Sequence, residues 1–278
     1  MTLKQELDKL VKIYDCQAYL KSDPIKFVHR YRDPLDQECV ALVVSSLSFG
    51  NVRAIFLTVE KLLAILGPRP VEFLQRGQFT KVQSVYHRWI TGQDLCVFLK
   101  ALAQIYESHA LLENFFMETS GETRELETLM NRFSRRLKSR FQKINGGALS
   151  RGLNFLIPAP EGKSTCKRLC MFLRWMVRRL SPDLGLWQRI SPSELFIPID
   201  THLSRLVKYL NLAPTKSSGW KLVTEATRSM KVLDELDPIK YDFALCRLGI
   251  LEHCQHAFVK SVCEKCPIES HCGLAKVH

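Results

Sequence analysis

Hydrophobic residues recur at helical spacing along almost the whole chain, and alternating runs of β-branched residues are nearly absent. This spacing predicts helices over residues 3–13, 79–90, 93–107, 109–118, 122–143, 219–235 and 238–252. Pro34 is placed to start a further helix through LDQECVALVVSSL, and Asn51 is placed to cap another that the GPRP stretch ends. We therefore predict an all-α protein.

One predicted helix begins at an acidic residue. The apolar stretch FIPI leads to Asp200, and Leu203, Leu206, Val207 and Leu210 then fall on one face of a helix. Asp200 stands at the N-cap, where its oxygens accept backbone N–H groups and the helix dipole favours the charged carboxylate. An aspartate in this place is most often only a cap, so the pattern alone does not make it catalytic.

Positive charge is concentrated in one window. Residues 131–180 hold thirteen Lys and Arg and a single acid, Glu161, so this window alone equals the net charge of +12 of the whole chain. A basic zone on an otherwise neutral body suits a polyanion such as nucleic acid, whose phosphates it neutralises. An anionic membrane surface and a merely solvated helix face are the alternative interpretations.

The centre of the basic window is predicted to be a helix that starts after a Gly-containing loop. Ser164 or Thr165 is expected to cap it, and it is expected to run through Arg179. At helical spacing Lys167, Arg174 and Arg178 point to one side, opposite the apolar stripe. A helix N-terminus after such a loop can also receive a phosphate.

Four of the ten cysteines form a cluster near the end of the chain. Cys254, Cys263, Cys266 and Cys272 have the spacing Cys-x8-Cys-x2-Cys-x5-Cys, which suits an iron–sulfur cluster or a tetrahedral zinc site. The single tight pair favours the [4Fe–4S] cluster over zinc, since zinc ribbons more often carry two such pairs. The other six cysteines are expected to be small buried hydrophobes rather than disulfide partners.

No apolar run approaches the length of a membrane-spanning helix, and the first residues lack the pattern of a targeting segment. We accordingly expect a cytosolic protein that does not associate with membranes. A lysine beside a carboxylate on a DNA-binding surface has a specific chemistry: a neutral amine can attack C1′ of a nucleotide, and a carboxylate can stabilise the positive charge that develops. Spacing alone does not show that two such groups meet.

The order of these segments resembles that of the helix-hairpin-helix DNA glycosylases of the endonuclease III type. The matching phrases are PAPEGKSTCKRLCMFLRWM, IPIDTHLSRLVKYLNLAP, YDFALCRLGILEHC and CEKCPIESHC, and the early segment from residue 32 is similar to the first core helices of those enzymes. The phrase KRLxMFLRWMVR is also similar to one in an uncharacterised bacterial family. The resemblance implies two helical subdomains flanking a cleft, with a C-terminal iron–sulfur loop.

The same resemblance implies roles for individual residues. Asp200 becomes the catalytic carboxylate, and the four clustered cysteines become the cluster ligands. Ser48, Asn51 and Arg53 fall where the family places residues near the flipped base or the duplex. Lys163, Ser164, Thr165, Arg174 and Arg178 are expected to contact DNA.

Three departures from the family pattern change the expectations. PAPEG replaces the hairpin Leu-Pro-Gly-Val-Gly, eight rather than six residues separate the first two cysteines, and the segment before Asp200 is longer. The lysine position of endonuclease III falls on Ser164, which cannot form a Schiff base. Lys167, with Arg174 seven positions later, instead resembles the archaeal 8-oxoguanine glycosylases. Lys163 is the alternative nucleophile. The third possibility is an enzyme that has no lysine nucleophile and in which Asp200 activates water.

Together these interpretations predict a DNA base-excision glycosylase with AP-lyase activity, acting as a monomer on double-stranded DNA that carries a damaged base. A non-catalytic nucleic-acid-binding protein on a glycosylase-like scaffold is the alternative. We expect a helical domain over residues 1–252 and a cysteine loop over 253–278. Within the domain, residues 34–145 form one subdomain, and the N-terminal helix joins 146–252 to form the other.

Overall fold

The computed structural model describes residues 1–14, 16–118, 123–251 and 253–275. These residues form α-helices and short 3-10 helices and no β-strand, so the predicted all-α class is confirmed; a single bridge pairs His87 with Ile90. None of the described helices has the length and apolar character needed to cross a membrane. The α-helices are α1 (Leu3–Ile13), α2 (Cys16–Tyr19), α3 (Pro34–Leu47), α4 (Val52–Leu66), α5 (Pro70–Arg76), α6 (Gly92–His109), α7 (Leu112–Met117), α8 (Leu126–Ile144), α9 (Arg151–Leu156), α10 (Lys167–Val177), α11 (Thr201–Tyr209), α12 (Gly219–Leu233), α13 (Asp242–Ile250) and α14 (Lys260–Cys263). The 3-10 helices are η1 (Leu20–Ser22), η2 (Pro24–Arg30), η3 (Thr80–Ser84), η4 (Pro192–Glu194) and η5 (Glu269–His271).

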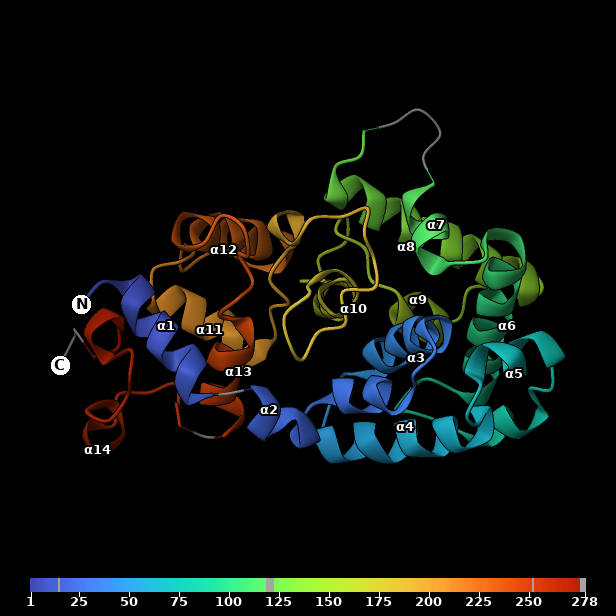
Figure 1. Ribbon diagram of the computed structural model, residues 1–278, viewed down its shortest axis with the longest axis horizontal. Coiled ribbons are helices and arrows are strands. Elements are labelled where there is room, and N and C mark those ends of the chain that lie inside the picture. The colour runs from blue at the N-terminus through green and yellow to red at the C-terminus, as the bar shows by residue number, and fades with distance from the viewer. Residues whose placement is uncertain (15, 119–122, 252, 276–278) are drawn as a thin grey trace.

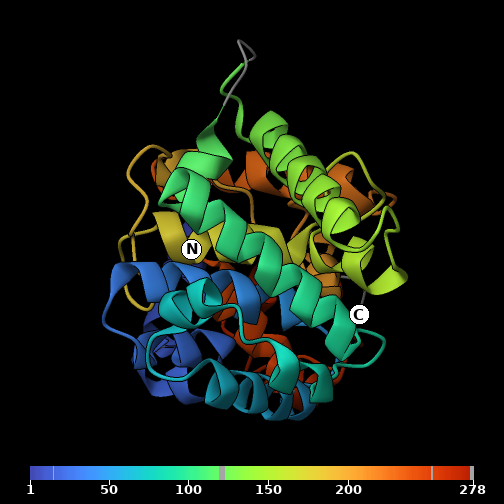
Figure 2. The same cartoon turned by 90° about the vertical axis from the view of Figure 1, so that its right-hand side faces the viewer.

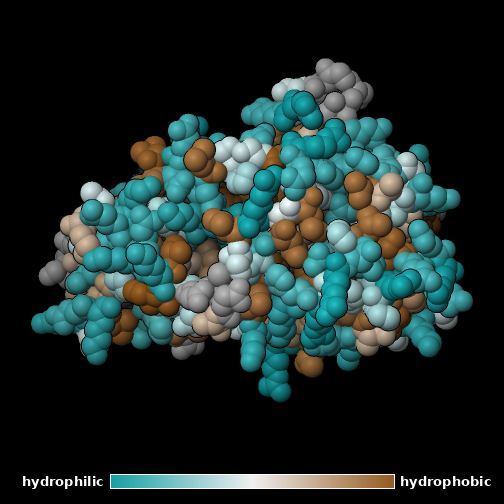
Figure 3. Space-filling view, viewed as in Figure 1, coloured by the Kyte–Doolittle hydropathy of each residue, from teal (hydrophilic) through white to brown (hydrophobic). Residues whose placement is uncertain are grey.

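The molecule is elongated, with α10 near its middle (Figure 1). One half holds α4 to α8, and α6 packs against α5, α7 and α8 there (Figure 2). The other half holds α11 to α14. Helix α1 packs against α13, so the two ends of the described chain lie in this same half. Helix α10 packs closely on α3. The face shown in Figure 3 is mostly hydrophilic, with hydrophobic side chains exposed in scattered groups.

Local sequence signals explain where several helices begin and end. Pro34 is the first residue of α3, behind Asp33, whose carboxylate accepts backbone N–H groups of the first turn. Asn51 caps α4 through the N–H groups of Arg53 and Ala54, and Gly67 ends that helix at a φ of 74°. These starts and stops agree with the predicted ones.

Two predictions of local structure were wrong. Residues 79–90 form only the short 3-10 helix η3, followed by the turn that pairs His87 with Ile90; Arg88 in this turn has a φ of 54°, which a helix does not allow. The Gly-rich passage after α8 contains the unpredicted helix α9, which Ser150 caps by accepting a hydrogen bond from the N–H of Leu153.

Candidate functional site

A cleft of about 650 Å³ lies between residues of both halves of the molecule. It is lined by the start of η2, the segment joining α3 to α4, one side of α10, the start of α11, and α13. Lys167 and Asp200, predicted from segments 33 residues apart, both line it, and so does Ser48. The fold therefore brings the two predicted catalytic residues to one cleft.

Asp200 is the N-cap of α11, as the sequence predicts. Its Oδ1 accepts the backbone N–H of Leu203 at 2.8 Å, and its backbone is extended before the helix starts. Its other oxygen, Oδ2, has no hydrogen-bond partner within the part of the chain that the structure describes. The carboxylate thus holds the helix start with one oxygen and leaves the second for other contacts.

Lys167 is the first residue of α10 and is half-buried. The helix was expected to be capped by Ser164 or Thr165 and to reach Arg179; instead Cys166 is the N-cap, at a φ of 50°, and the helix ends at Val177. Thr165 does not cap the helix, because its hydroxyl donates to the carbonyl of Ile199 at 2.8 Å. Because Ile199 directly precedes Asp200, this bond ties the start of α10 to the start of α11.

The charges of Lys167 and Asp200 both affect titratable groups on α13, which is further evidence that the two residues lie near each other. Burial raises the pKa of Cys246 on α13, the charges of Asp242 and Asp200 add to the rise, and Lys167 opposes it. Burial likewise raises the pKa of Asp242 to about 6, against the lowering effect of Arg174, and Asp200 adds to the rise. Lys167 and Asp200 therefore act on the same small region of α13.

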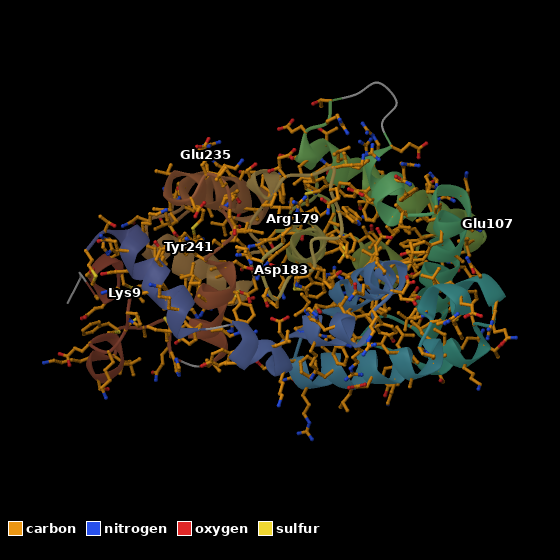
Figure 4. All side chains as sticks on the ribbon, in the orientation of Figure 1. Lys9, Glu107, Arg179, Asp183, Glu235 and Tyr241 are labelled. Atoms are coloured by element: carbon orange, nitrogen blue, oxygen red, sulfur yellow. The ribbon has the colours of Figure 1, made fainter. Side chains whose placement is uncertain are left out.

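Arg174 and Arg178, which were expected to contact DNA from one side of α10, are enclosed by the protein. Both are buried and face carboxylates: Asp183 is 3.1 Å from each guanidinium, Arg174 also pairs with Asp242, and Arg178 lies 2.8 Å from Asp237. Asp183 lies near the middle of the molecule in Figure 4. Arg174 and Arg178 therefore do not form an open basic face on this side of α10. Asp183 follows the helix closely in sequence, whereas Asp237 and Asp242 lie 59 and 68 positions from the arginines that they pair with.

The charges around Arg174 reinforce one another. Burial alone would lower the pKa of Arg174, but the carboxylates of Asp183 and Asp242 outweigh burial and raise it. A guanidinium with two carboxylate partners has little capacity left for a phosphate. This network therefore holds α10 against the segment after it and against α13.

The other predicted DNA contacts lie at the cleft or on the surface. Ser48 is buried and donates its hydroxyl to the carbonyl of Val44 at 2.8 Å, and the side chain of Asn51 is engaged as the α4 cap. Arg53 and Lys163 are exposed. Ser164 is exposed and accepts the N–H of Cys166 at 3.1 Å.

Of the thirteen basic residues in the charged window, four are buried: Arg132, Arg168, Arg174 and Arg178. The other nine are exposed or half-buried: five lie on α8, and the rest are Arg151 at the start of α9, Lys163 in the loop before α10, Lys167 at the start of α10 and Arg179 just after it. The window is therefore partly structural, and its remaining charges are those that can meet a polyanion.

Arg168 is a cleft residue to which the sequence analysis gave no role. Its guanidinium donates to the carbonyl of Ser46 on α3 at 2.6 Å and to that of Leu156 at 3.3 Å, and it lies 4.1 Å from the centre of the Phe155 ring. Burial lowers the pKa of Arg168 to about 10. Its position next to Lys167 was visible in the sequence, but its carbonyl partners on other segments were not.

The four clustered cysteines come together in a second, much smaller cavity of about 30 Å³. All four are half-buried, and Leu206, Leu248, Val262 and Ile268 share the lining. Burial raises the pKa of Cys266 to about 11, and the charges of Cys254, Cys272 and Cys263 add to the rise, so the sulfurs share one environment. As placed, however, no three Cys, His, Asp or Glu side chains among the described residues are close enough together to hold a metal ion. Four thiols are ligands that suit a soft metal ion. Their sulfurs stand too far apart, as placed, to bind one ion together.

The N-terminal helix α1 holds the segment that carries these cysteines. Tyr14 makes a 2.6 Å hydrogen bond with the His253 ring. Glu6, whose carboxylate is buried, lies 2.8 Å from the His271 ring and also accepts from the Ser270 hydroxyl. Contacts with α1 and its last turn thus hold both ends of residues 253–273, which we call the cysteine segment.

Comparison with curated proteins and comparison with solved structures each found no match. The likeness to helix-hairpin-helix glycosylases consequently stays a prediction from the sequence. A protein-family model matches residues 23–251, which is most of the chain. The matched region includes every residue that lines the cleft except Ser22. It does not include α1 or the four clustered cysteines. That family is described as Protein of unknown function (DUF2400), and the chain belongs to it.

Proposed function

We propose that this protein is a DNA base-excision glycosylase with AP-lyase activity, with a helix-hairpin-helix-like arrangement around the cleft. The observation that carries the proposal is the presence of Lys167 and Asp200 in one cleft, at two helix starts joined by the bond from Thr165 to Ile199. A cleft of about 650 Å³ is large enough for a nucleotide flipped out of a duplex.

In the proposed reaction the neutral amine of Lys167 attacks C1′ of the damaged nucleotide. The bond from C1′ to the base breaks, the base leaves with the electron pair and takes up a proton, and Asp200 stabilises the positive charge that develops on the sugar. Loss of the amine proton and opening of the sugar ring give a Schiff base between Nζ and C1′. Removal of a C2′ proton then expels the 3′ phosphate and cuts the strand.

The free Oδ2 of Asp200 suits this role. Because Oδ1 accepts the N–H of Leu203, the carboxylate is held at the helix start. Lys167 has no carboxylate partner within 4.0 Å among the described residues, so an ion pair does not hold its amine away from a substrate. The exposed and half-buried cations on α8 and around α9 would bind the phosphates of the duplex.

The cysteine segment is part of the proposal. We infer that it binds a [4Fe–4S] cluster through Cys254, Cys263, Cys266 and Cys272, with zinc as the alternative. Such a cluster would hold the segment in its folded form, and the sulfurs would have to draw closer than they stand. Protein purified without oxygen should be brown and absorb near ~400 nm; colourless protein with one zinc per chain would refute the cluster.

The chemical proposal is tested by trapping with borohydride, which reduces a Schiff base to a stable amine. The substrate is a duplex oligonucleotide with one abasic site, so the damaged base need not be known. We expect a covalent adduct with the natural protein and with Lys163→Ala, and none with Lys167→Ala. Lys163 is a matched control because it is an exposed lysine in the loop that leads directly to Lys167. An adduct that survives Lys167→Ala would remove Lys167 from the mechanism.

A non-catalytic nucleic-acid-binding protein is the second candidate, and the capping role of Asp200 favours it, since a cap needs no catalytic function to be explained. Asp200→Asn keeps an acceptor for the N–H of Leu203 but lacks the charge. If Asp200 is catalytic, this variant should bind abasic duplex DNA normally and release bases at least about 100-fold more slowly. Normal binding by a natural protein that neither releases bases nor forms an adduct would support the second candidate instead.

A further inference from the structure

Two histidines from distant segments meet beside the cleft. His202 is the second residue of α11 and lines the cleft, and His256 lies in the segment that carries the cysteines. Nδ1 of His202 is 2.9 Å from Nε2 of His256, and the two rings are stacked with their centres 5.2 Å apart. One ring must donate and the other accept, so the proton positions in the two rings are coupled.

The surrounding backbone is shaped around this pair. A Cβ at Gly249 on α13 would stand 2.7 Å from both Cβ and Cγ of His202, so only glycine leaves room for this ring. His256 itself has a φ of 57°, a conformation that costs energy for a residue with a side chain. The hydroxyl of Tyr209 donates to the carbonyl of His256 at 3.4 Å. Three segments thus hold the two rings together.

The same pair connects the cleft to the cysteines. His256 follows Cys254 by two residues, and its Nδ1 lies 4.0 Å from the Cys254 sulfur. At the other end of α11 the N–H of Gly273, next to Cys272, donates to the carbonyl of Tyr209 at 2.7 Å. The cysteine segment therefore contacts α11 at both ends, and Asp200 is the cap of this helix.

We propose that His256 is a positioning residue, which sets the proton and the orientation of His202 in the cleft and through it transmits the state of the cysteine segment to the start of α11. This inference rests on the proposed function of the cleft. With Nδ1 engaged by His256, Nε2 is the nitrogen that His202 presents to a nucleotide. The cysteine segment would then act on the reaction without touching the substrate.

The kinetic test compares His256→Ala, His256→Gln, His202→Ala and the double alanine variant on abasic duplex DNA, with single-turnover borohydride trapping and DNA affinity measured for each. We expect His256→Ala to trap about 10-fold more slowly with unchanged affinity, because a misplaced group beside the reacting atoms costs rate rather than binding. His256→Gln should recover most of the rate, since its amide can still pair with the His202 ring. The double variant should trap no more slowly than His202→Ala alone. If His256 acts only through His202, its removal costs nothing further once His202 is gone.

The control is His253→Ala, which removes a hydrogen bond from the same segment but on the side that faces Tyr14 and α1. It should trap at the natural rate. Iron and zinc contents must be equal in all variants, so that a loss of metal next to Cys254 is not mistaken for the loss of the ring contact. Slow trapping by His253→Ala as well, or additive losses in the double variant, would overturn the proposal.

A second arm does not depend on activity. Nitrogen-15 NMR of the labelled histidine rings reports the proton position in each ring. His202 should show a single proton-bearing nitrogen in the natural protein and in His253→Ala, and a mixture of both forms in His256→Ala. An unchanged His202 spectrum in His256→Ala would refute the pairing. If the natural protein traps no DNA at all, the glycosylase proposal fails, while this arm still decides the histidine pair.

Discussion

Replacing Thr165 by valine should damage the cleft more than its small chemical change suggests. Valine has nearly the same shape but lacks the hydroxyl that donates to the carbonyl of Ile199 at 2.8 Å, and Ile199 is fully buried. A net hydrogen bond contributes about 1 kcal/mol, and a buried acceptor left without a partner costs about 1–3 kcal/mol. We expect Thr165→Val to lower the free energy of unfolding by about 2 kcal/mol, measured by urea denaturation.

The kinetic consequence follows from the position of this bond. It joins the start of α10, which carries Lys167, to the residue before Asp200, so its loss should let the two groups move apart. Displacements of about 1 Å can cost about 100-fold in rate. We expect single-turnover trapping to slow by about 10-fold, because the rest of the cleft still limits the motion.

The control for this prediction is Thr165→Ser, which keeps the hydroxyl and loses only a methyl group. It should retain most of the stability and most of the trapping rate. If Thr165→Val traps and unfolds like the natural protein, or if Thr165→Ser is equally impaired, the bond to Ile199 does not hold the cleft together.

Two further predictions concern packing and buried charge. Gly249→Ala should lower the free energy of unfolding by about 1–3 kcal/mol, measured by urea denaturation, because the added Cβ must push the ring of His202 aside; a variant as stable as the natural protein would contradict the close approach. Arg174→Met should lower it by at least about 3 kcal/mol, because Asp183 would keep only one of its two arginine partners inside the protein. The matched change Arg76→Met, in an exposed ion pair on α5, should cost under about 1 kcal/mol by the same measurement, and equal losses in both variants would show that burial is not what matters.

The sequence allowed the fold class and several helix boundaries to be predicted, because those depend on neighbouring residues. Pro34, Asn51 and Asp200 each act within one turn of the helix they start, and each occupies the predicted place. Residues 79–90 were wrongly predicted as a helix because their apolar residues have helical spacing. The left-handed backbone of Arg88, which ends the helical path, cannot be recognised from that spacing.

The candidate site could be predicted only in part, for a related reason. Lys167 and Asp200 were identified individually, but the bond that ties their helix starts together joins Thr165 to a residue 34 positions away. Arg174 pairs with Asp183, 9 positions later in a loop whose path the spacing does not predict, and with Asp242, 68 positions away, so its charge appeared free in the sequence. Contacts of this kind depend on the whole fold, so periodicity and local charge do not contain them.

The packing of α1 against the cysteine segment also bears on the order in which the molecule folds. Glu6 meets Ser270 and His271 across more than 260 positions, so these are among the most distant contacts in the sequence. Loop-closure entropy opposes such contacts, and they become favourable once the intervening helices have already brought their partners together. During synthesis α1 emerges before the cysteine segment and has no such partner until that segment has been made. The cysteine segment should therefore be among the last parts to dock and among the first to open, which leaves its thiols accessible to reagents until late in folding.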